Sequence, residues 1–408
     1  MTMETARAAR KPCADLHASM RRNFELARRD YVAGHKSRHW DVFPPDFERV
    51  IDDVAVWADF RRNGIAAGMS INQTTDVAGR DDVPTPAQQR RVIGAYRDLV
   101  KHVDAAFVRD LLDGELGNPL AVDYDGLRLD HVDLRLVYAA WQIRRYLDVG
   151  ERPVLAEIGA GFGGLAAKLK RLYPDSTVIL FDLPEVNATQ TYYLHQAVPG
   201  ARFALYEDLL ARGMDALLAE HRDFIVLPGW TIADLPANAA DLVVNTRSMM
   251  EMNAETIRFY FRHLQAALRP GGLFYCANRY TKSTVGEEIR SKDYPFDANW
   301  LIVLSQPSWD QCWVHELAAL RTSRPNAYPP ARVLAALPPY RLSDVAGDLG
   351  AAARRLTAVV AGNHPSINPG LIYGARNVAK RLERRLVRAV KRRPVLHRAA
   401  RAVRRRLS

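Results

Sequence analysis

The stretch from Val154 to Gly164, V-L-A-E-I-G-A-G-F-G-G, decides the fold. Its first five residues are apolar apart from Glu157 and predict a short buried strand. The glycines that follow allow a sharp turn, and Leu165 and Leu169 then predict a helix that Pro174 ends. A strand, a glycine loop and a helix in this order are typical of a ligand site at the helix N-terminus of an α/β protein.

Strands and helices keep alternating after this stretch. Four further strands are predicted, at 177–181, 224–227, 241–244 and 272–277. A helix with one apolar face precedes the last of them, and 300–305 and 312–321 are expected to form an antiparallel pair at one sheet edge. Because such β-α repetition is typical of parallel sheets, we predict an α/β fold with a doubly wound, mostly parallel sheet.

Upstream of the sheet, residues 1 to about 150 are predicted to be mostly helical and to form a cap over the ligand site. The clearest helix runs from Asp133, which can cap it, to Val149, and Gly150 ends it. Its apolar stripes lie on two sides, so we expect it between the N-terminal region and the sheet. The predicted parts are a helical cap at 1–150, an α/β core at 151–322, a helical extension at 323–375 and a basic helical tail at 376–408.

The basic excess of the chain lies in its tail. The net charge is +11, yet residues 376–408 hold 14 Lys or Arg against one acid, while the first 375 residues hold 43 bases and 45 acids. The body therefore gives no indication of specific nucleic-acid binding. In the tail, Val378, Leu382 and Leu386 share one helical face among arginines, which predicts an amphipathic helix on an anionic membrane surface. Nucleic acid or a merely solvated tail would account for the same charge.

Composition excludes several classes of protein. A hydrophobic content of 48% with 25% charged residues predicts a folded globular chain. No stretch approaches the roughly 20 apolar residues that span a bilayer, and the basic N-terminus precedes no apolar block. Cys13, Cys276 and Cys312 lack the spacing of a disulfide framework or a zinc site, and no acid and histidine cluster has metal-ligand spacing. We therefore expect a cytoplasmic protein that needs no metal.

Two carboxylates beside the glycine loop narrow the choice of ligand. The loop satisfies G-x-G-x-x-G at Gly159, Gly161 and Gly164, which fits a nicotinamide or flavin dinucleotide. Asp182, which closes the next strand, can accept both hydroxyls of a ribose and fits either kind of ligand. Glu157 disfavours a pyrophosphate and favours an ammonium or sulfonium ligand such as S-adenosylmethionine. In another α/β protein the glycines would make only a tight turn, and Asp182 would cap a helix.

Together these motifs resemble those of class I S-adenosylmethionine-dependent methyltransferases, which have a Rossmann-like fold. The motifs are E-I-G-A-G-F-G-G at 157–164, F-D-L-P-E at 181–185, D-L-V-V-N at 241–245 and L-R-P-G-G at 268–272. With N-T-R-S-M-M-E-M at 245–252, their wording is similar to bacterial sugar O-methyltransferases of polysaccharide gene clusters, over residues 150 to 282. The resemblance places these residues at the cofactor: Glu157, Gly159, Gly161, Gly163, Asp182, Trp230 and Asn245. Trp230 would contact the adenine, although a tryptophan there is as often part of a core.

Methyl transfer to a hydroxyl requires a group that takes up the proton, and this base is expected beyond the strand ends beside the cofactor. The segment 245–253 is that place, and Glu251 is its only carboxylate. In related plant-type O-methyltransferases a histidine precedes the acid here, but this sequence has Met250 at that position when aligned from Asp241. Glu251 is predicted to act as the base itself or to hold a base such as His315 in place. The alternatives are that Glu251 only begins the next helix favourably and that His315 is a structural residue.

The acceptor is predicted mainly from the resemblance. Arg279 and the loop at 281–300 mix basic and aromatic side chains that suit a sugar, although such loops are common. We predict an S-adenosylmethionine-dependent O-methyltransferase for a sugar hydroxyl of a surface polysaccharide or glycoside, at the inner face of the cytoplasmic membrane. The alternatives are a methyltransferase for a phenol or polyketide, a Rossmann oxidoreductase, or a noncatalytic membrane or nucleic-acid binding protein on the same scaffold.

Overall fold

The computed structural model describes residues 14–31, 51, 57, 60–61, 83–282, 286–311 and 313–335. The chain forms two compact units, one of residues 1–84 with 95–339 and one of residues 85–94 with 340–408. In the second unit the structure describes 85–94, which include the first part of helix α5 (Pro86–Leu99). The first unit contains the sheet and the pocket described below.

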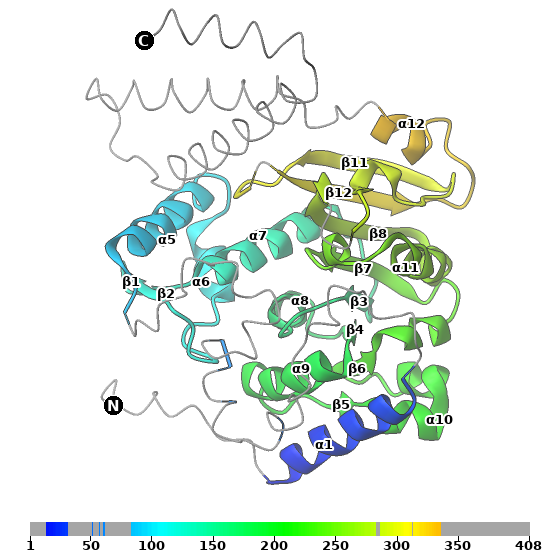
Figure 1. The fold of residues 1–408 in the computed structure, drawn as a ribbon, viewed down its shortest axis with the longest axis horizontal. Helices are drawn as coiled ribbons and strands as arrows, with labels where there is room; N and C mark the ends of the chain where they lie inside the picture. The colour runs from blue at the N-terminus through cyan, green and yellow to red at the C-terminus, as the bar shows by residue number, and fades with distance from the viewer. Residues whose placement is uncertain are drawn as a thin grey trace, which may run out of the picture. The chain divides into compact units, whose positions relative to one another are not determined.

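An eight-stranded sheet in the order β11-β12-β8-β7-β3-β4-β6-β5 forms the centre of the first unit (Figure 1). All pairs from β8 to β5 are parallel, whereas β12 pairs antiparallel with both β8 and β11. The strands are β3 (Val154–Ile158), β4 (Thr177–Asp182), β5 (Phe203–Ala204), β6 (Phe224–Pro228), β7 (Ala240–Thr246), β8 (Leu268–Arg279), β11 (Trp300–Pro307) and β12 (Val314–Arg321). This arrangement confirms the predicted α/β class and the predicted antiparallel pair at one edge. The sheet interior is apolar, with Leu155, Ile179 and Val243 fully buried, as strands covered on both faces require.

Helices cover both faces of this sheet (Figure 1). They are α7 (His131–Tyr146), α8 (Gly164–Leu172) and α9 (Pro184–Ala197) on one side, and α10 (Tyr206–Ala219) and α11 (Ala254–Ala267) on the other. The apolar face predicted for α11 is present, because Ile257, Phe261 and Leu264 are buried in one core cluster with Phe274 of β8. Short 3-10 helices η3 (Gly229–Asp234), η4 (Met249–Glu251) and η5 (Ser291–Asp293), together with β9 (Thr281–Lys282) and β10 (Ile289–Arg290), complete the connections.

The described N-terminal residues are mainly helical, as predicted, but they pack on the core at two places. Helix α1 (Ala14–Arg29) lies against α9 and α10, where Arg22 and Asn23 bind the carboxylate of Glu207. Helix α6 (Ala105–Leu111) and a hairpin of β1 (Val122–Tyr124) and β2 (Leu127–Leu129) precede α7. Helix α7 packs against α8 and α6, between the preceding region and the α/β core.

The predicted cap of helix α7 was wrong by three residues. Asp130 is the N-cap, and its carboxylate accepts a hydrogen bond from the Asp133 backbone N–H at 3.0 Å. The Asp133 carboxylate instead lies 2.6 Å from Nζ of Lys168, which is completely buried. A buried lysine requires a carboxylate partner, and this tertiary contact determines the role of Asp133. The helix ends at Tyr146, before Gly150.

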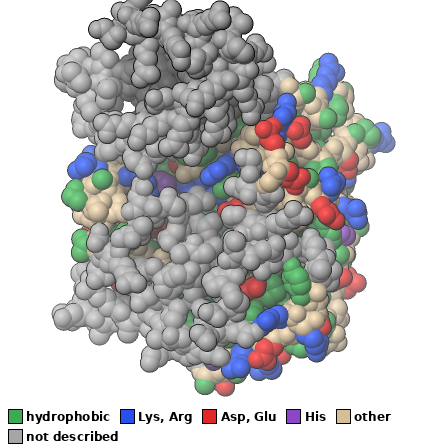
Figure 2. Space-filling view, in the orientation of Figure 1, with side chains coloured by type: hydrophobic (Ala, Val, Ile, Leu, Met, Phe, Trp, Pro, Cys, Tyr) green, Lys and Arg blue, Asp and Glu red, His purple; other side chains and the backbone are tan. Residues whose placement is uncertain are grey.

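The last described element is α12 (Pro330–Ala335). The predicted helix at about 342–360 and the basic tail at 376–408 lie outside the described residues. Within the part of the chain that the structure describes, no helix is both long and apolar enough to cross a membrane. Figure 2 shows basic and acidic side chains interspersed on the visible described surface, in agreement with the balanced charge of the first 375 residues.

Candidate active site

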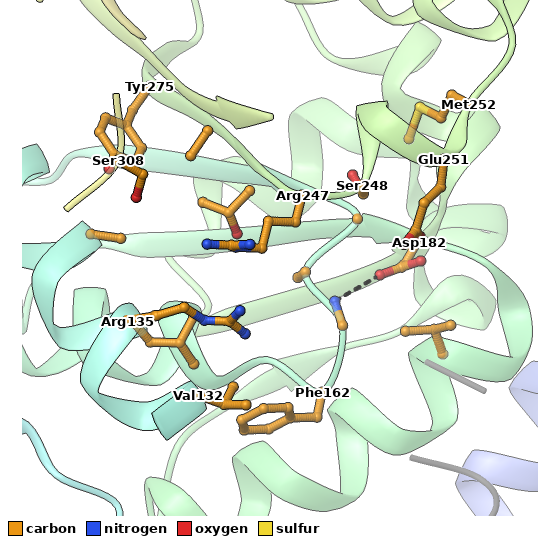
Figure 3. Close-up of a pocket in the computed structure, with 18 of the residues that line it drawn as sticks. Val132, Arg135, Phe162, Asp182, Arg247, Ser248, Glu251, Met252, Tyr275 and Ser308 are labelled. Carbon is orange, nitrogen blue, oxygen red and sulfur yellow. Dashed lines mark hydrogen bonds between the residues drawn. The ribbon is translucent and has the colours of Figure 1, made fainter. Parts of the chain in front are cut away.

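A pocket lies at the carboxyl ends of the parallel strands, where ligands bind in open α/β sheets (Figure 3). The glycine loop after β3, the end of β4 and the segment after β7 form one part of it. Helix α7 and the connection from β11 to β12 form the opposite part. Its main polar and aromatic lining residues are Arg135, Tyr138, Phe162, Asp182, Arg247, Ser248, Glu251, Tyr260, Tyr275, Ser308, Trp309 and Asp310.

The glycine loop has a conformation that side chains would prevent. Gly159 has a φ of +67°, and a β-carbon on it would lie 2.1 Å from Oγ of Ser248. Gly161 has a φ of +57°, but a β-carbon there would meet nothing within 4 Å, so this part of the main chain is open to a ligand. Gly163, with a φ of +93°, is the N-cap of α8 and packs on Leu194 outside the pocket lining. The loop therefore needs glycine at 159 for packing and offers bare backbone at 161.

Asp182 joins the end of β4 to the glycine loop. Its carboxylate accepts hydrogen bonds from the backbone N–H of Gly161 at 3.2 Å, from that of Leu183 at 2.8 Å and from Nε2 of Gln190 at 2.9 Å. Burial is the main reason why its pKa rises to about 7, although these three donors lower it. Each carboxylate oxygen has two lone pairs, so the group can still accept hydroxyl donors from a ligand.

Glu157 lies in β3 behind the loop and does not line the pocket. Its side chain is buried, and Oε2 has no hydrogen-bond partner among the described residues. Burial, together with the nearby Asp182 carboxylate, raises the pKa of Glu157 well above its ordinary value. A positive ligand in the loop would favour the charged form of both carboxylates.

Glu251 is held in the pocket by the short helix η4 after β7. It is 8% exposed, and burial raises its pKa to about 7 against the opposing effects of Lys282 and Arg279. Figure 3 shows its side chain beside that of Asp182. A carboxylate with a pKa near neutrality can take up a proton at physiological pH, as a general base must.

His315, the second predicted catalytic residue, is not brought to the pocket. Its ring is 2% exposed in β12, stacks on Tyr280 at 4.7 Å, and has both nitrogens 2.9 Å from a serine oxygen, of Ser291 and Ser305. Burial lowers its pKa to about 4. This environment matches the alternative that His315 is a structural residue.

Two predicted cofactor residues also lie outside the lining of the pocket. Asn245 is completely buried at the end of β7, where its amide donates to the carbonyl of Ile158 at 2.9 Å and supports the strand before the glycine loop. Trp230 packs against the hydrophobic core, with ring contacts to Tyr31 at 5.7 Å and Tyr206 at 6.2 Å. Of the predicted site residues, the structure thus brings together Gly159, Gly161, Asp182 and Glu251.

The sequence did not reveal Arg135, Arg247 and Trp309 as pocket residues. Arg247 lies within the segment 245–253 already assigned to the site, so its position after a strand was an available signal. Arg135 lies in a helix whose pattern indicates only two apolar stripes, and it reaches the pocket through the packing of α7. Trp309 lies in the connection from β11 to β12, which no motif singles out.

Part of the chain, including the glycine loop, is similar to known O-methyltransferases. Residues 137–207 match the O-methyltransferase domain family, and this segment contains the glycine loop and Asp182. A segment of 56 residues, 14% of this chain, is 45% identical to acetylserotonin O-methyltransferase of Rattus norvegicus; the match spans only 12% of the length of that relative.

Solved methyltransferase structures are also similar. A mitomycin 7-O-methyltransferase has a TM-score of 0.31 and 16% identity, covering 78% of this chain and all of its own (100%). A methyltransferase bound to the Haloferax volcanii Trm112 activator has a TM-score of 0.32 and 14% identity, covering 47% of this chain and 92% of its own.

The sheet is of the Rossmann-like α/β type, and the matched segment 137–207, which contains the glycine loop, is similar to O-methyltransferase domains, whose cofactor is S-adenosylmethionine. The residues present fit this cofactor. The bare backbone at Gly161 leaves room at the loop, Asp182 can accept ribose hydroxyls, and the unpartnered Oε2 of Glu157 suits a positive rather than a phosphate ligand. A Rossmann oxidoreductase would place its pyrophosphate beside this carboxylate, and for that reason it is disfavoured.

Proposed function

We propose that this protein is an O-methyltransferase that transfers the methyl group of S-adenosylmethionine to a hydroxyl of a sugar or glycoside. The main support is that one pocket contains the glycine loop, Asp182 and Glu251. The first two suit a nucleoside with a positive charge, and the third suits a proton acceptor. The choice of a sugar as acceptor rests on the resemblance of the motifs. The family match does not support it, since residues 137–207 do not include the pocket residues that follow β7.

In this proposal the protein positions the acceptor and takes up its proton. The cofactor supplies a methyl carbon that is already activated by a sulfonium. Bound there, the cofactor would give this methyl group to the acceptor oxygen and would leave as S-adenosylhomocysteine, which keeps the electron pair of the broken carbon–sulfur bond. Glu251 takes the hydroxyl proton, for which a pKa of about 7 is suitable. Alignment of the oxygen in the pocket supplies the remaining part of the rate enhancement.

A phenol or a related aromatic molecule is the second candidate acceptor. Tyr138, Phe162 and Trp309 line the pocket and would pack against an aromatic ring as well as against a sugar face. The matched relative acts, by its name, on acetylserotonin, which favours this alternative.

The first experiment is a titration of the full-length protein with S-adenosylhomocysteine and, separately, with NADH. Binding of the first ligand alone is expected, whereas tight NADH binding without it would refute the methyltransferase proposal. A screen with a labelled methyl donor against sugars, glycosides and phenols then identifies the acceptor. Labelling of phenols alone would replace the sugar by the second candidate.

We also propose that the basic tail at 376–408 holds the protein on an anionic membrane surface. The support is the concentration of 14 basic residues in this segment and its apolar stripe. A surface on which lipid-linked saccharides are built would bring the enzyme close to its acceptor.

A further inference from the structure

The pocket has a basic wall, to which Arg135 of α7 and Arg247 of the segment after β7 contribute. Figure 3 shows the side chains of Arg135 and Arg247 reaching from two sides into one part of the pocket, apart from the side chain of Asp182. If the cofactor lies along the glycine loop and Asp182, as proposed above, the space beside the two arginines is left for the acceptor. The charge of this wall therefore indicates the chemistry of the acceptor.

Arg247 is held firmly in this position. Its φ of 67° lies in the left-handed region, which is unfavourable for a residue with a β-carbon, and its backbone N–H donates to the carbonyl of Ala277 at 2.8 Å. The guanidinium donates to both carboxylate oxygens of Asp310 at 3.1 Å and to Oε1 of Gln311 at 2.7 Å. An uncommon backbone conformation maintained at a pocket is often connected with function.

The carboxylate of Asp310 interacts with more than one basic side chain at this wall. Asp310 is buried, and Arg247, Arg135 and His131 together hold its pKa below the ordinary value, although burial opposes them. Among the described residues that line the pocket, Asp310 is the carboxylate on this side. Among the described residues that line this wall, two guanidinium groups stand with one carboxylate, and an anionic acceptor group would add to the charge balance of the wall.

An unsatisfied donor lies on the same wall. Nε1 of Trp309 is buried and has no hydrogen-bond partner among the described residues, although Trp309 lines the pocket. Its ring lies 5.5 Å from that of Tyr138. A buried N–H without a partner is costly, so an oxygen-rich acceptor group would stabilise this site.

We propose that the acceptor carries a carboxylate or a phosphate, and that Arg135 and Arg247 bind this group and determine acceptor specificity. Guanidinium groups bind both anions through paired N–H donors. The inference rests on the proposed function, because it assigns the acceptor side of the same pocket. The anion would hold the acceptor so that its hydroxyl faces the cofactor.

The test is a calorimetric titration of the full-length protein saturated with S-adenosylhomocysteine, at constant ionic strength. The probes are glucuronate, glucose 6-phosphate and glucose. At least one anionic sugar is expected to bind in the millimolar range or tighter, about tenfold or more above glucose. The stronger of the two identifies the group as a carboxylate or a phosphate. Equal binding of all three probes, or no binding of either anion, would overturn the proposal.

Three variants separate specific recognition from damage to the fold. Arg135→Gln is expected to weaken binding of the anionic probe at least about tenfold. Arg145→Gln removes the same charge from an exposed position of α7 outside the pocket lining and should leave binding unchanged. Asp310→Asn removes the competing carboxylate and should tighten binding, a gain that misfolding cannot produce. Equal affinities for the first two variants, or weaker binding by the third, would contradict the assignment.

Failure of the proposed function would be seen separately. If S-adenosylhomocysteine does not bind, the methyltransferase proposal fails, whereas titration of the protein alone with the same probes still tests the basic wall.

Discussion

Asp182 is a carboxylate whose ionisation should control cofactor binding. Its pKa is raised to about 7, so below this pH it is protonated and a poorer acceptor for ribose hydroxyls. Because folding raises this pKa, the free protein loses stability as the pH rises from about 4 through about 7, and ligand binding offsets this loss at higher pH.

We therefore expect the affinity for S-adenosylhomocysteine to rise about tenfold between pH 6 and pH 8, as one proton is released. Asp182→Asn should bind more weakly by about 1–3 kcal/mol at pH 8 and show a flat profile, since a neutral amide does not titrate. Calorimetry over this pH range measures both. A wild-type affinity independent of pH would show that the carboxylate does not contact the ligand.

Glu251 gives a second prediction at the level of one residue. Glu251→Gln should lower the turnover of methyl transfer by about 10²-fold or more, because the amide cannot take up the hydroxyl proton, while binding of S-adenosylhomocysteine is kept. The turnover of the wild type should increase as the pH rises through about 7, where this carboxyl loses its proton. The control is Glu255→Gln in the exposed first turn of α11. Near-normal turnover of Glu251→Gln would transfer the role of base to another group or to water.

At the scale of elements, a buried ion-pair cluster attaches helix α7 to the core. Nζ of Lys168 in α8 lies 2.5 Å from Asp113, which follows α6, and 2.6 Å from Asp133 in α7. All three side chains are almost completely buried, and Arg171 and Tyr193 also bind Asp113. The cluster joins α7 and α8 to the segment after α6, so it holds α7, which lines the pocket, against the core.

Lys168→Met should destabilise the protein by about 3–5 kcal/mol, because it leaves buried carboxylates without the cation they share. Lys101→Met, a change of the same kind at an exposed lysine, should cost less than about 0.5 kcal/mol. Denaturant unfolding of both variants measures the difference. Similar midpoints for the two would mean that the cluster contributes nothing to stability.

The elements also show why some features could be predicted from sequence. The strands β3, β4, β6 and β7 were recognisable because parallel strands covered on both faces are continuous apolar runs. Strand β5, with two residues, and the β1–β2 hairpin, with three in each strand, are too short to produce a pattern. Asp130 and Asp133 are both plausible caps, and only the contact with Lys168 distinguishes them.

The candidate site was predictable where its residues follow one another in the chain. The glycine loop and Asp182 end successive strands of one sheet, so the topology places them together. The basic wall of the pocket combines α7, the segment after β7 and the connection from β11 to β12. More than 50 residues separate each of these segments from the next in the sequence. No local sequence pattern predicts that these segments lie together, because their proximity depends on the packing of α7 and on the antiparallel edge of the sheet.

At the scale of the whole molecule, the distribution of charge suggests a division between catalysis and location. The first 375 residues hold 43 bases and 45 acids, whereas 376–408 hold 14 bases and one acid. Each basic residue near an anionic membrane contributes about 1 kcal/mol at modest salt. We therefore expect attraction to an anionic membrane to depend on the tail and to be lost when the tail is removed. The pocket residues all lie before the tail, between Val132 and Asp310.

Full-length protein is accordingly expected to sediment with anionic liposomes at low salt, and deletion after Tyr373 should abolish this while methyl transfer to a water-soluble acceptor continues. A second variant, with Leu382 and Leu386 changed to Gln, keeps every charge and removes part of the apolar stripe, so it should sediment less because the tail can no longer insert. If this variant sediments like the wild type, charge alone accounts for liposome binding and the apolar stripe does not contribute. If an added oligonucleotide also displaces both proteins from the liposomes, nucleic acid competes with the membrane for the tail. Equal sedimentation of the truncated protein would place any membrane contact elsewhere in the chain.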